Sequence, residues 1–180
     1  MNEQLTILTT SRTTKSEQLL SSAPVAGSVR SVHFSSVSNE WQTPDNLFRS
    51  LNERFKFTLD PCCTHESAKC EKHYTITDNG LAQDWSKDVV FMNPPYGREI
   101  SKWIRKAYLE SKKGATVVCL IPARTDTSYW HNYIFGKAKI EFLKGRVKFK
   151  NNTVDYKGHT PGAPFPSAII IYNGENHVEH

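Results

Sequence analysis

The stretch V-V-F-M-N-P-P-Y-G at residues 89–97 constrains the fold more than any other part of the sequence. Its apolar beginning is typical of an interior strand of a parallel sheet. Pro94 and Pro95 then end the strand, because proline has no backbone N–H for the hydrogen-bond ladder. Asn93 is therefore expected at the carboxyl end of a buried strand. Ligands bind at this edge in open α/β sheets, so the motif is a candidate active-site loop.

Helix and strand patterns alternate along the chain. Helices are predicted from Pro44, with Thr43 as the N-cap, from Ile100 to a stop at Gly114, and at residues 128–135. Strands are predicted at residues 57–60, 73–77, 89–92, 115–122, 139–143 and 167–172. This alternation indicates an α/β fold of three layers.

A single domain is expected from 180 residues with 38% hydrophobic content, which suffice for one core. Residues 1–38 contain 14 Ser or Thr and a single aromatic residue, Phe34. Such a segment offers little apolar surface to offset the entropy lost on ordering. We therefore expect a flexible Ser/Thr-rich arm at residues 1–38, a domain at residues 39–175 and a short tail at residues 176–180.

The positive charge is concentrated in the second half of the chain. The formal net charge is +5, yet residues 98–150 hold 13 Lys and Arg against 4 Asp and Glu. A basic region of this kind indicates a polyanionic partner such as nucleic acid, with a solvated lysine-rich face as the simpler alternative. The sequence shows neither a signal-peptide pattern nor a long apolar run, so we expect a cytoplasmic protein that does not enter a membrane.

The residues N-P-P-Y suit the activation of a nucleobase amino group. Such an amine is a poor nucleophile, because its lone pair is delocalised into the ring. Hydrogen bonds from the amine to the side-chain oxygen of Asn93 and the carbonyl of Pro94 would localise that lone pair on nitrogen. Tyr96 would offer a face on which an extruded base could stack. A rigid turn without catalytic function is the alternative for the four residues taken alone.

The motif resembles the (N/D/S)-P-P-(Y/F/W) signature of amino-group methyltransferases that use S-adenosylmethionine. Further segments are similar, in the same order, to the phage-type DNA N6-adenine methyltransferases; they are E-W-Q-T-P at residues 40–44, L-D-P-C at 59–62, A-K-C at 68–70 and G-L-A-Q-D-W at 80–85. The resemblance implies a Rossmann-like class I methyltransferase fold, with a central, mostly parallel sheet and helices on both faces. It also implies transfer of a methyl group from S-adenosylmethionine to N6 of a flipped adenine in DNA.

The resemblance assigns roles to residues outside N-P-P-Y. Trp41, Thr43 and Pro44 match a motif that lies against the cofactor, and Asp60 with Pro61 matches the turn that holds its methionine portion. A carboxylate suits that place, because it can accept hydrogen bonds from the ligand's α-ammonium group. Asp78 is implied for the ribose hydroxyls and Asp84 for the adenine amino group. The sequence C-C-T-H after Asp60 departs from the broader pattern, which has a glycine-rich turn there.

Contacts with DNA are expected from the basic second half, because the interval between Asp60 and Asn93 is too short for an inserted recognition domain. The candidate contacts are Arg98, Arg124, Lys144, Arg146 and Lys148. The resemblance suggests G-A-T-C as the recognition site and a phage origin, with methylation as protection against restriction. The oligomeric state does not follow from the sequence.

Three alternatives remain open at this point. The cysteines and histidines at residues 62, 63, 65, 70 and 73 include C-x-x-H twice, a spacing found in zinc sites, although we expect no metal because free cysteines are common in reducing compartments. N-P-P-Y also occurs in enzymes that methylate RNA bases or the amide of a protein glutamine. A DNA-binding module, with or without zinc, that keeps the fold but lacks activity is the third alternative.

Overall fold

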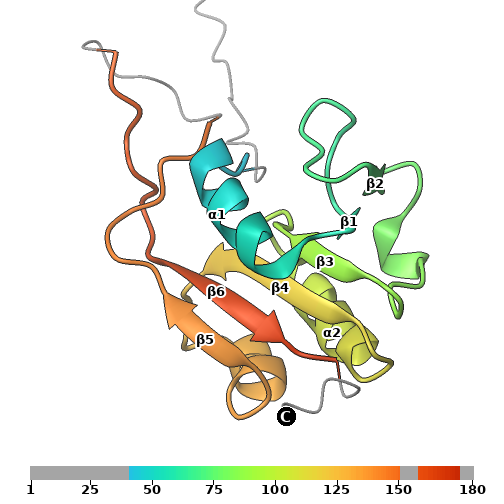
Figure 1. The fold of residues 1–180 in the computed structure, drawn as a ribbon. Coiled ribbons are helices and arrows are strands. Elements are labelled where there is room, and N and C mark those ends of the chain that lie inside the picture. The colour runs from blue at the N-terminus through green and yellow to red at the C-terminus, as the bar shows by residue number, and fades with distance from the viewer. Residues whose placement is uncertain (1–40, 151–157, 175–180) are drawn as a thin grey trace, which may run out of the picture. The chain divides into compact units, whose positions relative to one another are not determined.

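The computed structural model describes residues 41–150 and 158–174. The expected N-terminal arm and C-terminal tail lie outside these ranges. Within the described residues the chain forms a six-stranded sheet in the order β2-β1-β3-β4-β6-β5 (Figure 1). The strands are β1 (Leu59–Asp60), β2 (Lys72–His73), β3 (Val89–Met92), β4 (Thr116–Pro122), β5 (Lys139–Phe142) and β6 (Ser167–Tyr172).

The sheet is mixed. Strands β2, β1, β3 and β4 run parallel to one another, whereas β6 is antiparallel to both of its neighbours, β4 and β5. The α/β class is thus confirmed, and the reversal of β6 makes the sheet mixed. The central strand β6 pairs over its full length with β4, from Val117 opposite Tyr172 to Pro122 opposite Ser167.

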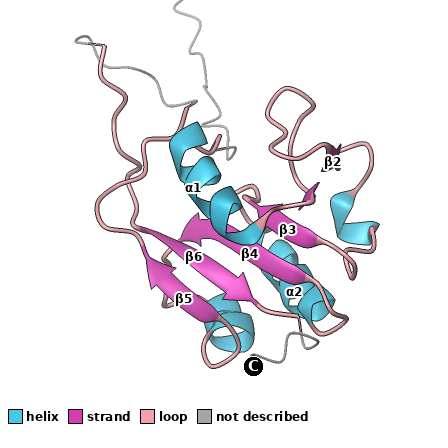
Figure 2. Ribbon diagram, in the orientation of Figure 1, coloured by secondary structure: helices cyan, strands magenta, loops and turns pink. Residues whose placement is uncertain are grey.

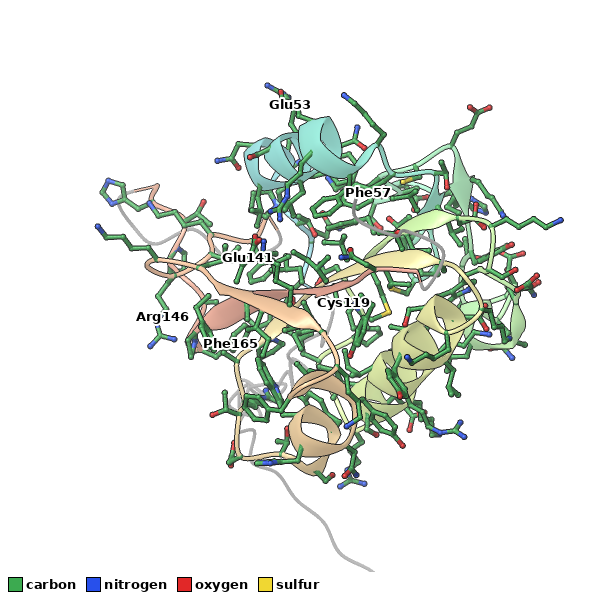
Figure 3. All side chains as sticks on the ribbon, turned by 60° about the horizontal axis from the view of Figure 1, so that its bottom comes forward. Glu53, Phe57, Cys119, Glu141, Arg146 and Phe165 are labelled. Carbon is green, nitrogen blue, oxygen red and sulfur yellow. The ribbon has the colours of Figure 1, made fainter. Side chains whose placement is uncertain are left out.

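Helices cover both faces of the sheet (Figures 1 and 2). Helix α1 (Asp45–Phe55) lies on one face, where Phe48 meets Phe91 of β3 edge to face, with the ring centroids 5.1 Å apart. Helix α2 (Ile100–Ser111) and the π-helix η2 (Trp130–Ile134) lie on the other face, as the turned view in Figure 3 shows. A short 3-10 helix, η1 (Gly80–Ala82), precedes β3.

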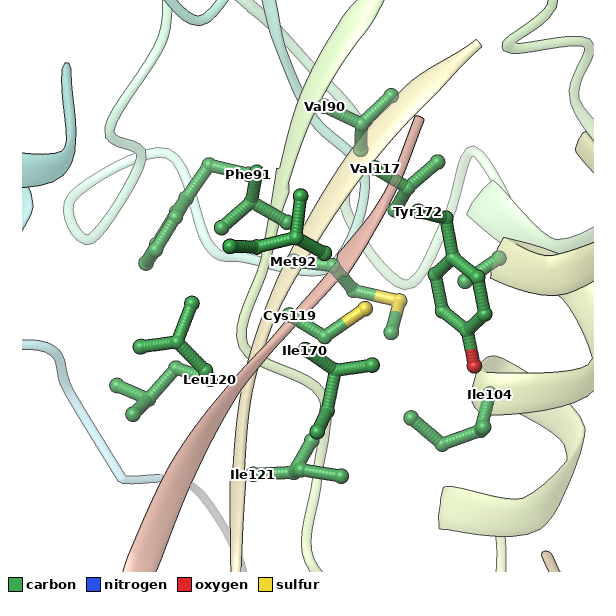
Figure 4. Close-up of a cluster of buried hydrophobic side chains, with 14 of the residues drawn as sticks. Val90, Phe91, Met92, Ile104, Val117, Cys119, Leu120, Ile121, Ile170 and Tyr172 are labelled. Atoms are coloured by element: carbon green, nitrogen blue, oxygen red, sulfur yellow. The ribbon is translucent and has the colours of Figure 1, made fainter. Parts of the chain in front are cut away.

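The core is built around β3, β4 and β6. Every residue of β6 and all but the first residue of β3 and β4 are buried. Figure 4 shows Met92, Cys119 and Ile170 of these strands packed together, with Ile104 of α2 beside Tyr172. Continuous apolar runs form these strands because their side chains are buried on both faces of the sheet. The rigid central sheet fixes the positions of the turns that follow its strands.

Two predicted strands are shorter than expected. The run at residues 57–60 pairs in the sheet only at Leu59 and Asp60, although the rings of Phe57 and Phe91 are in contact. The strand expected at residues 73–77 is wrong beyond His73. The reason is that the N–H of Thr75 donates to the carboxylate of Asp78 at 2.8 Å instead of to a strand.

The start of the first helix also differs from the prediction. Helix α1 begins at Asp45, its N-cap is Pro44, and no side chain caps it. The predicted capping role of Thr43 is therefore wrong. The hydroxyl of Thr43 instead accepts a hydrogen bond from the side chain of Asn93.

No helix among residues 41–150 and 158–174 combines the length and the apolar character needed to cross a membrane.

Candidate functional site

The sheet topology places Asp60 and Asn93 at the same edge of the sheet. β1 pairs with β2 on one side and with β3 on the other, so the strand order reverses at β1. Asp60 is the last residue of β1, and Asn93 follows the last residue of β3, the neighbouring parallel strand. The carboxyl ends of parallel strands meet at one edge of a sheet, and a crevice opens where the order reverses.

A pocket of about 400 Å³ lies at this edge. This volume is within the range of small-molecule sites. Its wall combines the segment before α1, the turn after β1, the connection from β2 to η1, and the start of α2. The lining residues are Trp41, Gln42, Thr43, Asp60, Pro61, Cys62, Cys63, Thr64, Ser67, Lys69, Thr75, Ile76, Asn79, Gly80, Leu81, Phe91, Asn93, Pro95, Glu99 and Trp103.

Asp60 is a buried carboxylate at the pocket wall, with 4% of its surface exposed. Its oxygens accept backbone N–H bonds from Cys62 at 3.4 Å and Lys69 at 3.1 Å. Burial raises the pKa of Asp60, and these two bonds offset only part of that effect. Among the described residues no Lys or Arg forms an ion pair with it. A cationic ligand group would supply the missing charge.

Gly80 allows the turn after β1 to pack closely. A Cβ atom at this position would lie 2.0 Å from the carbonyl oxygen of Pro61. The carbonyl oxygen of Gly80 in turn accepts a hydrogen bond from the indole N–H of buried Trp85 at 3.0 Å. Any larger side chain at residue 80 would displace the backbone next to Asp60. The role of Gly80 was not predicted, although the residue opens the segment G-L-A-Q-D-W.

The side chain of Asn93 is held by three partners. Its Nδ2 donates to the carbonyl oxygen of Trp41 and to Oγ1 of Thr43, the latter at 2.9 Å. Its Oδ1 accepts a hydrogen bond from the hydroxyl of Tyr96 at 2.7 Å. The N-P-P-Y motif is thus joined to the segment before α1, more than fifty residues earlier in the chain.

Tyr96 points into the protein and not into the pocket. It is 3% exposed, and burial raises the pKa of its hydroxyl well above the ordinary value. The ring packs against three aromatic rings, with centroid distances of 6.4 Å to Trp41, 6.1 Å to Phe149 and 5.5 Å to Phe165. The ring of Tyr96 is therefore enclosed by other aromatic rings, in contrast to the open stacking face expected from the sequence.

The residues predicted for catalysis and cofactor binding divide into those that line the pocket and those that do not. The pocket is lined by Trp41, Thr43, Asp60, Pro61, Asn93 and Pro95, but not by Pro44, Asp78, Asp84, Pro94 or Tyr96. Asp78 is exposed and fixes the turn after β2 by binding the backbone and hydroxyl of Thr75. Asp84 binds Ser86 and lies near Lys113, so the structure does not bring it to the pocket.

All five basic residues considered for DNA contact are exposed; they are Arg98, Arg124, Lys144, Arg146 and Lys148. Arg124 lies next to the N-P-P-Y motif, since its Nη1 donates to the carbonyl oxygen of Tyr96 at 3.4 Å. Arg146 extends away from the core on the segment after β5 (Figure 3). The same segment continues to Phe149, which packs against Tyr96. Two of the segments that carry these basic residues therefore contact Tyr96 of the motif, one through Arg124 and the other through Phe149.

The cysteine and histidine cluster does not form a metal centre in the described part of the chain. No three His, Cys, Asp or Glu side chains there are arranged to hold an ion. Cys62, Cys63 and Cys70 are free thiols. His65 and His73 bind each other, with Nδ1 of His65 2.9 Å from Nε2 of His73.

Several pocket residues were not predicted from the sequence. Lys69, Ile76, Gly80, Leu81, Glu99 and Trp103 line the pocket without having been proposed as site residues. A partial signal existed, because Lys69 lies in A-K-C, and Gly80 and Leu81 lie in G-L-A-Q-D-W. For Ile76, Glu99 and Trp103 the sequence offered no such signal.

Comparison with known proteins gives concordant matches. The family model described as DNA N-6-adenine-methyltransferase (Dam) matches residues 30–176. A protein of Escherichia coli K12 called putative methyltransferase YfdM is 45% identical over 67 residues, which cover 33% of this chain and 74% of that relative. The DNA N-6-adenine-methyltransferase of Haemophilus phage HP1 is 28% identical over 115 residues, which cover 62% of this chain and 66% of that relative.

Proposed function

Because the chain belongs to the DNA N-6-adenine-methyltransferase (Dam) family, we propose that it transfers the methyl group of S-adenosylmethionine to N6 of adenine in DNA. The observation that carries the proposal is the meeting of two strand ends at one pocket. Asp60 ends β1 and Asn93 follows β3, and both line the same cavity. Asp60 suits a cationic methyl donor, and Asn93 suits the amine that accepts the methyl group.

The cofactor assignment rests on the fit between Asp60 and a cation. A buried carboxylate that forms no ion pair with a Lys or Arg of the described residues gains most from an ammonium ligand. The pocket is also large enough for a small molecule of this class. We assign the α-ammonium group to Asp60, with Pro61, Trp41 and Thr43 along the ligand. When bound, S-adenosylmethionine would supply an electrophilic methyl group on its sulfonium sulfur. Transfer of this methyl group to N6 would leave S-adenosylhomocysteine as the second product.

Asn93 and Pro94 activate the attacking nitrogen in this proposal. The side-chain oxygen of Asn93 and the carbonyl of Pro94 accept hydrogen bonds from the two hydrogens of the adenine amine, which localises the lone pair on N6. Pro95 stiffens the loop that holds these groups. After attack, the surplus proton on N6 passes to water, so no general base is required. Holding the two reactants together supplies much of the remaining rate enhancement.

The target adenine must leave the duplex, because N6 inside the stack cannot reach the pocket. Stacking of the flipped base on Tyr96 requires that ring to become exposed, since it is packed against Trp41, Phe149 and Phe165. We assign contacts with the DNA phosphates to the exposed basic residues of the second half of the chain. These are Arg98, Arg124, Lys144, Arg146 and Lys148.

The proposal is tested by incubating the protein with S-adenosylmethionine carrying a labelled methyl group and with unmethylated DNA. We expect label in the DNA and N6-methyladenine when the modified bases are mapped by sequencing. RNA and whole-cell protein extract serve as parallel acceptors, and label in either of them without label in DNA would favour the alternative substrates.

Asn93→Ala is the matched control for the chemistry. Removing the amide should lower kcat by roughly 10²- to 10³-fold, as for other groups that stabilise the transition state. Cofactor affinity, measured by calorimetry, should stay within about twofold, since the carboxylate of Asp60 is retained. An unchanged kcat would reject the catalytic assignment of Asn93, and absence of any activity in the unaltered protein would favour a module that only binds DNA.

A further inference from the structure

The contacts of Asn93 define which way its amide faces. Trp41 offers a carbonyl oxygen, which can only accept a hydrogen bond, so Nδ2 must lie on that side. Both hydrogens of Nδ2 are then used, one by Trp41 and one by Oγ1 of Thr43. Oδ1 has two lone pairs, and only one of them is occupied by the hydroxyl of Tyr96. One acceptor position on Oδ1 is left for another donor.

The hydroxyls of Thr43 and Tyr96 are themselves firmly placed. Thr43 is 2% exposed, and its hydroxyl does not cap helix α1. The hydroxyl of Tyr96 lies 2.7 Å from Oδ1 of Asn93 and 3.1 Å from the carbonyl oxygen of Leu120 in β4. These contacts attach the amide to the segment before α1 on one side and to the centre of the sheet on the other.

From this geometry we infer that Thr43 and Tyr96 are positioning residues that lock the amide of Asn93 with its oxygen available to the substrate amine. The inference rests on the proposed function and assigns to both hydroxyls a task distinct from cofactor contact and base stacking. We name this set of contacts the amide clamp, which consists of the Trp41 carbonyl, the Thr43 hydroxyl and the Tyr96 hydroxyl around Asn93.

The amide clamp also affects the strength of the acceptor. When both hydrogens of an amide nitrogen are bound, electron density shifts toward its oxygen, because hydrogen bonds in a chain polarise one another. Oδ1 thereby becomes a better acceptor for the amine that it is to activate. Without the lock, the amide could rotate by 180° and present two donors to a substrate group that also carries two donors.

Substitution of Thr43 separates the clamp from a cofactor contact. Thr43→Val keeps the shape, and with it the packing contact proposed for Thr43 along the cofactor, but removes the hydroxyl acceptor. We therefore expect kcat on unmethylated DNA to fall by about tenfold, the loss of one hydrogen bond. KM for DNA and the Kd of S-adenosylmethionine should stay within about twofold. Thr43→Ser should restore kcat. A raised cofactor Kd with unchanged kcat would overturn the inference in favour of a role in cofactor binding.

Tyr96→Phe separates the hydroxyl from the ring. The ring, and with it any base stacking, is retained, so the variant should match the unaltered protein if stacking is the only task of Tyr96. The amide clamp instead requires kcat to fall by about tenfold. Full activity of Tyr96→Phe would overturn the inference.

A spectroscopic measurement tests the clamp without using activity. In protein with ¹⁵N-labelled asparagine, the side-chain NH2 signals of Asn93, identified by their loss in Asn93→Ala, should exchange slowly with solvent. Thr43→Val should accelerate exchange of one hydrogen and leave the folded spectrum intact. Rapid exchange of both hydrogens in the unaltered protein would reject the clamp even if methyl transfer is normal, whereas slow exchange in a protein that does not methylate DNA would reject only the proposed function.

Asn93→Asp gives a distinctive pH profile. A carboxylate has no hydrogen to donate to the Trp41 carbonyl, so the clamp accommodates only the protonated acid. Relative to the unaltered protein, activity of the variant should fall by about tenfold per pH unit in the range where the carboxylate predominates. Parallel pH profiles for the two proteins would contradict the inference.

Discussion

Two buried carboxylates at opposite ends of the sheet differ in their partners. Asp60 ends β1 at the carboxyl edge, whereas Glu110 of α2 lies near the amino ends of β3 and β4. Both are almost fully buried, with exposures of 4% and 1%. Glu110 binds Lys106 and Lys113 at 2.8 and 2.7 Å and accepts the N–H of Trp85 at 2.9 Å. Asp60 instead accepts the backbone N–H groups of Cys62 and Lys69 and interacts with the thiol of Cys63, and no Lys or Arg among the described residues forms an ion pair with it.

The difference in partners separates a structural carboxylate from one that is available to a ligand. Burial alone would raise the pKa of Glu110, but its two lysines outweigh that effect and hold the pKa below the ordinary value. At Asp60 burial prevails and the pKa is raised. A charge that is satisfied within the protein stabilises the fold, whereas a charge that remains costly in the free protein favours a cationic ligand. Functional residues are therefore better sought among buried charged groups that lack an ion-pair partner within the protein.

The largest expected effect in this comparison is on stability, from Glu110→Ala. The variant leaves the N–H of buried Trp85 without its acceptor and removes the carboxylate with which both lysines form ion pairs. Loss of a buried ion pair typically costs about 3 kcal/mol or more, and we expect about 3 kcal/mol here because Lys113 can turn to solvent. Urea denaturation measures the change, and cofactor affinity should not move.

Glu141→Ala is the control for this prediction. Glu141 also pairs with two basic residues, Arg54 and Lys139, but at the exposed edge strand β5. Surface pairs contribute at most about 1 kcal/mol. Equal losses of unfolding free energy in the two variants would show that the burial of Glu110 does not make its ion pairs stronger than the surface pairs of Glu141.

Asp60→Asn should lower cofactor affinity without lowering stability, the opposite of what is expected for Glu110→Ala. Its cofactor affinity should fall by about 10- to 100-fold, because a charge-assisted hydrogen bond to the ligand is lost. The free protein should be as stable as the unaltered one or more stable, because a desolvated charge is removed. Calorimetry and thermal unfolding provide the two measurements. Asp84→Asn is the control, since Asp84 lies outside the pocket; a loss of affinity there would revive the role that the family resemblance implies for it.

The sequence predicted those parts of the fold that local pattern determines. β3, β4 and β6 appear as continuous apolar runs, because each is buried on both sides. β2 was predicted too long because its pattern does not reveal that Asp78 captures the N–H of Thr75. Likewise, Thr43 has the residue type and position of an N-cap, but the partner of its hydroxyl comes from a turn fifty residues away.

In the candidate site, too, the residues set by local pattern were predicted and those set by tertiary packing were not. Asp60 and Asn93 were found because a polar residue directly after an apolar strand points to the ligand edge of a sheet. Lys69, Ile76 and Gly80 reach the pocket through the connection from β1 to β3, whose path depends on tertiary packing. The inward direction of Tyr96 was also not predictable, because its partners Phe149 and Phe165 lie far along the chain.

A smaller effect should appear in the dependence of stability on pH. Glu110 has a lowered pKa, so its contribution is complete above about pH 4.3, the unfolded value, and is lost as the pH falls further. Asp60 has a raised pKa, so stability declines as the pH rises from about 3.9 through its folded value. Each group contributes at most about 1.4 kcal/mol per pH unit to the slope of the unfolding free energy against pH.

Urea denaturation of the unaltered protein, Asp60→Asn and Glu110→Ala across pH 3.5 to 8 measures the two linkages. The advantage of Asp60→Asn over the unaltered protein should grow with increasing pH. The deficit of Glu110→Ala should shrink below about pH 4.3. Curves of the same shape for both variants would remove the electrostatic distinction between the two ends of the sheet.

The smallest expected effect comes from Ile76, an apolar residue at the pocket that is 95% exposed. Its side chain stabilises nothing in the free protein, so Ile76→Ala should change the free energy of unfolding by less than about 0.5 kcal/mol. A ligand that covers it removes apolar surface from water, and truncation should then weaken cofactor affinity by up to about fivefold, or about 1 kcal/mol. Leu109→Ala on α2 is the control, because Leu109 is also apolar and exposed but lies outside the pocket. If calorimetry shows equal affinities for the two variants, the ligand does not reach the turn after β2, and the carboxyl edge acts through Asp60 and its immediate neighbours alone.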